Sequence, residues 1–96
     1  MEERIEKVLD FASKHFGVTK DDIIGKKHFK DMSFARSIVF RFLKCEMGYS
    51  TNALSRIFGR ARRVMITSLN KSRSFNKADE GIYQEFVDLY KKSHPS

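Results

Sequence analysis

The side chains best suited to chemistry in this 96-residue chain are cations, and they are concentrated in one segment. Residues 47–78 contain no Asp or Glu. The 12 cations and 12 anions outside this segment balance, so residues 47–78 carry the whole net charge of +7. Lys and Arg neutralise phosphates, and a one-sided block of positive charge predicts a polyanionic partner. The seven cations of the segment are Arg56, Arg60, Arg62, Arg63, Lys71, Arg73 and Lys77.

Residues suited to catalysis or to metal binding are few and scattered. The three histidines, His15, His28 and His94, lie far apart and match no metal or nucleophile spacing. The sequence has no Gly-rich phosphate loop of the Walker type and no dinucleotide fingerprint. Its one cysteine, Cys45, continues an apolar stripe, which predicts a core thiol rather than a catalytic one. We therefore expect a protein that is not an enzyme and that uses no cofactor and no metal.

Length and composition predict one globular domain over residues 1–96. A single cysteine excludes an intrachain disulfide. No apolar run approaches the roughly 20 residues that span a membrane. The N-terminal stretch "MEERIEKVLD" is acidic and helical, unlike a signal peptide. We expect a cytoplasmic protein without a membrane partner.

The elements that position the cations are predicted to be helices. Apolar residues recur at helical spacing almost throughout, and no alternating strand pattern reaches five residues, so the predicted fold is all-α. Core positions of the fifth helix are predicted at Ile66 and Leu69. Glycines and capping residues divide the chain into six helices. The first helix ends at Gly17, and the second runs from Thr19 to Gly25. The third begins at the N-cap Asp31 and ends near Gly48, and the fourth runs from Ser50 or Thr51 to Gly59. The fifth ends near Ser72, and the sixth spans 76–93 with an apolar stripe of Ile82, Tyr83, Phe86, Val87 and Tyr90.

Residues 50–72 predict a helix-turn-helix, in which the second helix enters the major groove of DNA. Gly59 breaks the first helix, and small Ser55 lies where the second must pack closely. A turn one residue longer than the tightest form brings Ala61 and Leu69 inward. Arg60, Arg62 and Arg63 then stand at the N-terminal end of the second helix, which carries the positive helix dipole and usually reaches base edges.

Two further segments are candidates for contact with the phosphate backbone. Ser50, Thr51 and Asn52 begin the first helix of the motif and offer hydroxyls and free backbone N–H groups. The basic loop "KKHFK", residues 26–30, is suited to follow the backbone or to reach into a minor groove. The alternatives stay open: the arginines form a solvated face, and the loop is an ordinary polar loop with Phe29 folded inward.

The segment "VLDFASKHFGVTKDDIIGKK" resembles the opening of the C-terminal, duplex-binding domain of the bacterial chromosomal replication initiator DnaA. The resemblance extends through Arg36 and Lys44 to "STNALSRIFG" and covers about residues 5–75 without obvious gaps. It implies a helical domain of the Trp-repressor kind, double-stranded DNA as the partner, and a bacterial, nucleoid-associated location. The ATPase domain of that initiator is absent from this sequence, so a stand-alone binding module is expected.

The base-reading signature of that family, Gly-Gly-Arg-Asp-His-Thr-Thr-Val, is not retained here. The ungapped continuation places Ala61 at the family's Arg, unless Arg60 takes its place through a one-residue shift, and puts Arg62 and Arg63 at its Asp and His. The minor-groove Arg of the family falls on His28. We expect retained duplex binding with altered or relaxed sequence preference. The expected contacts are Lys26, Lys27, His28, Lys30, Arg36, Ser50, Thr51, Asn52, Arg56, Arg60, Arg62, Arg63, Thr67 and Lys71.

Three functions follow as competing hypotheses. The first is DNA binding in replication initiation or its regulation. The second is a small helix-turn-helix transcriptional regulator that reads a palindrome as a dimer. The third is a protein-interaction module whose basic face binds an acidic protein. The last helix, 76–93, either closes the core or presents a surface for a homodimer or a protein partner.

Overall fold

The computed structural model describes residues 3–24 and 30–94, and of residues 30–33 it describes the helical backbone alone. The described chain forms six α-helices and no strand, which confirms the all-α prediction. It is compact, with a Cα radius of gyration of 12.2 Å. The helices are α1 (Glu3–Phe16), α2 (Lys20–Ile24), α3 (Lys30–Cys45), α4 (Thr51–Phe58), α5 (Arg62–Arg73) and α6 (Lys77–Ser93).

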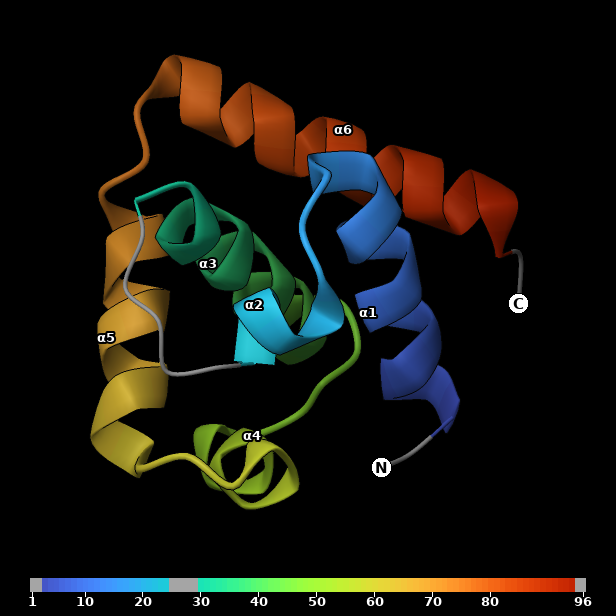
Figure 1. Ribbon diagram of the computed structural model, residues 1–96. Coiled ribbons are helices and arrows are strands. Elements are labelled where there is room, and N and C mark those ends of the chain that lie inside the picture. Colours follow the sequence, from blue (N-terminus) through green and yellow to red (C-terminus); the bar gives the residue numbers. More distant parts are fainter. Residues whose placement is uncertain (1–2, 25–29, 95–96) are drawn as a thin grey trace.

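The long helix α3 runs through the middle of the molecule (Figure 1). Residues 35–40 are buried without interruption, so α3 has no solvated stripe over that stretch, as expected of a helix covered on all sides. Helices α1, α2 and α5 pack against it, and α6 crosses one end of the molecule beside α1. Helix α4 lies at the opposite end from α6, and α5 connects the two ends (Figure 1). The core is therefore built around α3.

Local capping signals account for the ends of the short helices. Thr19 and Asp22 cap α2 reciprocally, each accepting from the other's backbone N–H at 3.1 and 3.0 Å. Ser50 Oγ accepts from the N–H of Ala53 at 3.1 Å and begins α4. Gly59 ends α4 with φ of 63°, in the left-handed region that disfavours residues with a Cβ. These predicted boundaries are confirmed.

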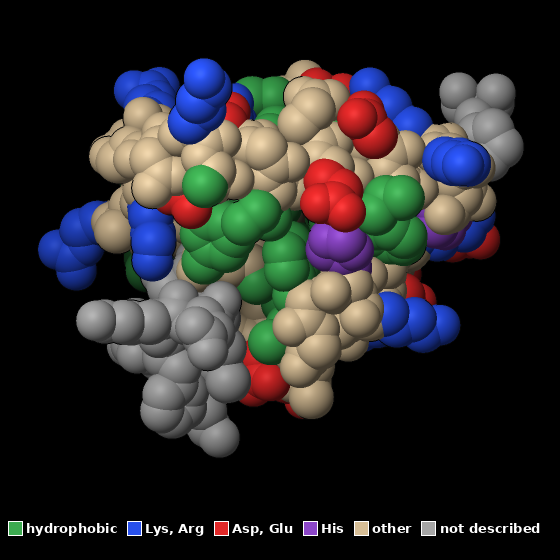
Figure 2. Space-filling model, turned by 90° about the horizontal axis from the view of Figure 1, so that it is seen from above, with side chains coloured by type: hydrophobic (Ala, Val, Ile, Leu, Met, Phe, Trp, Pro, Cys, Tyr) green, Lys and Arg blue, Asp and Glu red, His purple; other side chains and the backbone are tan. Residues whose placement is uncertain are grey.

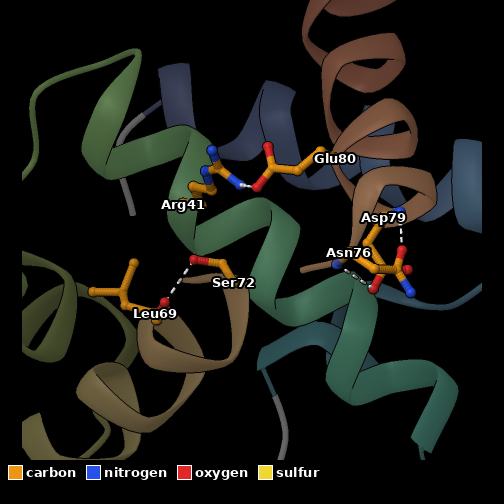
Figure 3. A network of polar contacts seen from close by, with 6 residues as sticks. All are labelled: Arg41, Leu69, Ser72, Asn76, Asp79 and Glu80. Atoms are coloured by element: carbon orange, nitrogen blue, oxygen red, sulfur yellow. Dashed lines mark hydrogen bonds and ion pairs between the residues drawn. The ribbon is translucent and has the colours of Figure 1, made fainter. Parts of the chain in front are cut away.

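Polar contacts also join the start of α6 to its neighbours (Figure 3). Asn76 accepts from the N–H of Asp79 at 2.8 Å and its own N–H donates to the Asp79 carboxylate, so they form a capping box. Arg41 Nη1 on α3 donates to Glu80 Oε1 at 2.7 Å. The same guanidinium lies 4.2 Å from the ring centroid of Tyr83. The contacts of Arg41 tie α6 to the central helix.

Several predicted positions differ from the structure. Helix α3 begins at Lys30, so Asp31 lies inside the helix and is not its N-cap. The same helix ends at Cys45, three residues before Gly48. Cys45 is exposed, not buried, because it is the last residue of α3 and borders an open hollow beside Leu69.

The inward faces of α5 and α6 are also narrower than predicted. Ile66 and Ile82 are each 38% exposed. In α5 the buried positions are Met65, Leu69 and Ser72, at intervals of four and three residues, so Ile66 falls one position off the covered stripe. Ala61, predicted inward, is exposed and precedes the helix.

Candidate nucleic-acid interface

Helices α4 and α5 form a tightly joined pair. Only Gly59, Arg60 and Ala61 separate them. Leu54 and Phe58 bury the inner face of α4, and the Phe58 ring packs 5.2 Å from that of Phe40 on the central helix. Met65 and Leu69 bury the inner face of α5. Because both helices are anchored to the core, the end of α5 that follows the turn has a fixed direction.

The N-terminal end of α5 is uncapped and cationic. Ala61 precedes the helix in an extended conformation and supplies no side-chain cap. Its carbonyl accepts from the N–H groups of Val64 and Met65. Within the described residues the N–H groups of Arg62 and Arg63 have no hydrogen-bond partner, and both side chains are exposed. Free N–H groups, the helix dipole and two guanidiniums therefore favour an anion at this point.

Two other arginines extend this cationic surface along the pair. Arg56 on α4 and Arg73 at the end of α5 are exposed. In the part of the chain that the structure describes, Arg56, Arg62, Arg63 and Arg73 take part in no ion pair. By contrast, Lys20, Arg41 and Lys91 are each paired with a carboxylate elsewhere in the fold. We call the four arginines 56, 62, 63 and 73 the arginine surface.

The structure places Arg36 and Arg60 differently from the other expected contacts. Arg36 is 4% exposed and donates to the carbonyls of Asp22 and Ile23. Arg60 is partly buried and donates to the carbonyl of Ile24 at 3.1 Å. Burial, and then the nearby Arg60 charge, lower the pKa of Arg36. These two guanidiniums point toward α2, so their placement does not support the direct contact with DNA that the sequence predicts.

The start of α4 and the outer face of α5 carry the remaining described candidates. Ser50 Oγ is engaged as the cap of α4, whereas Asn52 is exposed. Thr51 Oγ1 accepts from Lys44 Nζ at 3.2 Å, which brings an exposed cation from the last turn of α3 to this helix start. Lys44 was not among the expected contacts, although the segment that resembles the initiator domain includes it. Thr67 and Lys71 are exposed on α5.

Most of the basic loop, residues 26–30, lies outside the residues that the structure describes. Lys26, Lys27 and His28 fall outside the described residues, and Lys30 is described only as the first residue of α3. Nothing in the structure therefore bears on their predicted role.

The α6 side has a different character. Figure 2 views the molecule from this side and shows acidic, histidine and hydrophobic side chains in the middle, with Lys and Arg toward the edges. Ile82 and Leu89 are exposed on α6. No group of three potential metal ligands occurs among the described residues. None of the described helices has the length and apolarity needed to cross a bilayer.

Comparison with known proteins found no matching family model, curated protein or solved structure. The resemblance to the initiator's DNA-binding domain therefore rests on the residues quoted for it.

Proposed function

We propose that this protein binds double-stranded DNA, with α4 and α5 acting as a helix-turn-helix of the kind found in Trp repressor and in the DNA-binding domain of DnaA. Helix α5 enters the major groove by its N-terminal end, and α4 crosses the backbone. The observation that carries the proposal is the arginine surface: four exposed guanidiniums without ion pairs in the described chain, two of them at an uncapped helix start.

The arrangement suits phosphate binding in the first place. Each phosphate neutralised by a cation releases condensed counterions, so the affinity falls with salt by a slope of about 0.9 per contact in a log–log plot. Four contacts correspond to a slope of about −3.6. Arg62 and Arg63 have planar guanidinium groups that also match the two acceptors on the guanine edge, so they are the candidates for base contacts.

Within DNA binding, the arrangement favours a module that acts through one helix-turn-helix. Helix α6 lies at the opposite end of the molecule from α4 (Figure 1). A dimer formed through α6 would hold the two α5 starts at the far ends of the assembly, which does not suit two adjacent half-sites of a palindrome. A role at replication origins or in their regulation is proposed on the resemblance to DnaA.

The test is duplex binding at several salt concentrations, with sequencing of the duplexes retained from a random pool. The variant is Arg62→Ala with Arg63→Ala. Its control is Lys14→Ala with Lys92→Ala, which removes two exposed cations from α1 and α6 instead. We expect the arginine variant to lose at least about tenfold in affinity and about 1.8 in salt slope. The control should lose little of either.

Each outcome has a distinct meaning. No binding at low salt refutes DNA as the partner and supports an acidic protein partner. Equal losses in both double variants mean that net charge, not the α4–α5 pair, drives binding. A motif enriched from the pool identifies the preferred site, and retention without a motif means contact with the backbone alone.

A further inference from the structure

Two arginine side chains converge on the carboxyl end of α2. Arg36 Nε donates to the carbonyl oxygen of Ile23 at 2.7 Å, and its Nη2 donates to that of Asp22 at 3.0 Å. Arg60 Nη1 donates to the carbonyl oxygen of Ile24 at 3.1 Å. The last carbonyls of a helix lack partners inside it. The two guanidiniums therefore cap α2, and we call this set of three hydrogen bonds the arginine junction.

Arg60 is fixed through its main chain as well. Its N–H donates to the carbonyl of Ser55 at 3.1 Å, and its carbonyl accepts from Ser55 Oγ at 2.5 Å. Only Ala61 separates Arg60 from Arg62, the first residue of α5. Arg60 thus links three helices: α2 through its side chain, α4 through its main chain, and α5 through the sequence. A displacement of Arg60 is expected to change the direction of the start of α5.

The junction holds two like charges close together. Arg36 is 4% exposed, and the charge of Arg60 adds to the effect of burial in lowering its pKa. Such a placement costs free energy, which charge-assisted hydrogen bonds to carbonyls offset. A guanidinium that moved out to a phosphate would give up these bonds. Arg62 and Arg63 are exposed, and within the described residues their side chains make no such bonds.

We propose that Arg36 and Arg60 are positioning residues, which hold the α4–α5 pair against α2 and make no contact with phosphate. The proposal rests on the proposed function, because it assigns these two arginines a role in duplex binding. It separates them from the arginine surface, although the sequence places all of them in the same basic set.

The salt dependence of duplex binding distinguishes positioning from contact. Arg60→Ala removes the side-chain bond to α2, and Ser55→Ala weakens the same turn without changing any charge. Loss of one positioning hydrogen bond predicts about a fivefold weaker affinity for each variant. The salt slope should stay at the wild-type value in both, whereas Arg62→Ala should lower it by about 0.9. Lys92→Ala, on α6, is the control for loss of one charge.

A second measurement needs no DNA. In the ¹H–¹⁵N spectrum of the free protein, the Nε–H of Arg36 should exchange slowly with solvent because it is buried and hydrogen-bonded. Ser55→Ala and Arg60→Ala should shift the amide signals of residues 62–64. Lys92→Ala should not.

Two results would overturn the proposal. One is a fall in salt slope of about 0.9 for Arg60→Ala, which would identify Arg60 as a phosphate contact. The other is wild-type affinity in both Ser55→Ala and Arg60→Ala. If the wild-type protein binds no duplex, the proposed function fails and the positioning role fails with it. The amide signals then still decide whether the junction orients the start of α5.

Discussion

Tyr83→Phe is expected to stabilise the protein. Tyr83 is 5% exposed, and its hydroxyl is buried without a hydrogen-bond partner in the described part of the chain. A buried, unpartnered hydroxyl costs about 1–3 kcal/mol. Replacing Tyr by Phe also weakens the contact of the ring with Arg41, by roughly 0.5 kcal/mol. The net expectation is a gain of about 1 kcal/mol in the free energy of unfolding, or about 4–8 °C in Tm.

The gain should grow at high pH. Burial, followed by the nearby Cys45, raises the pKa of Tyr83 to about 12, whereas Arg41 opposes the rise. The hydroxyl therefore ionises first in the unfolded chain, near pH 10. Ionisation of this group therefore leaves the stability unchanged below pH 10 and lowers it as the pH rises toward 12. The loss is about 1.4 kcal/mol per pH unit, so at most about 2.7 kcal/mol by pH 12. Tyr83→Phe lacks this loss.

The assay is urea unfolding followed by far-UV circular dichroism, at pH 7 and at intervals from pH 9 to 12. Tyr90→Phe is the control at pH 7, because the Tyr90 hydroxyl is not among the buried groups that lack a partner. Destabilisation of Tyr83→Phe by 1 kcal/mol or more at pH 7 would mean that the hydroxyl is hydrogen-bonded. An unchanged stability difference between wild type and Tyr83→Phe from pH 9 to 12 would refute the raised pKa.

Three further predictions concern local features. Gly59→Ala should lower the free energy of unfolding by about 1–2 kcal/mol, because φ at this position is 63°, which disfavours a residue with a Cβ. The added Cβ would meet nothing within 4 Å, so the backbone angle is the whole cause. A loss below a few tenths of a kcal/mol would mean that the turn relaxes freely. Ser50→Ala should lower the free energy of unfolding by about 1 kcal/mol through loss of the α4 cap, as measured by thermal melts. Ser74→Ala is the control and should be neutral, because Ser74 is exposed and its side chain makes no hydrogen bond in the described chain. Cys45 should react with Ellman's reagent in the native protein as fast as in urea, and protection in the native state would show that the thiol is covered.

The sequence was sufficient for features whose cause is local. The cap of α4 needs only Ser50 and a backbone N–H three residues on, and the end of the same helix needs only a glycine. The charge segregation is likewise a property of the sequence, since no fold can neutralise residues 47–78 from within the segment. These inferences required no knowledge of distant neighbours.

Burial at the edge of a helical stripe depended on tertiary structure. Ile66 and Ile82 follow an apolar period, but neighbouring helices cover only a narrower part of that face. Cys45 continues a stripe too, yet α3 ends at Cys45 beside an open hollow, and the thiol is exposed. Periodicity identifies the apolar face of a helix, but it does not show how much of that face the neighbouring helices cover.

Composition, periodicity and capping residues were enough to establish that the chain is helical, where α2, α4 and α6 begin, and that one segment carries the excess positive charge. Which arginines are presented to solvent depended on how the helices pack. Arg36 and Arg60 are buried or half-buried against carbonyls 13 and 36 residues away, whereas Arg62 and Arg63 remain exposed. A guanidinium donates hydrogen bonds to a carbonyl oxygen as it does to a phosphate. Only the packing of α2 against α3 and against the turn of residues 59–61 brings carbonyls within reach of Arg36 and Arg60.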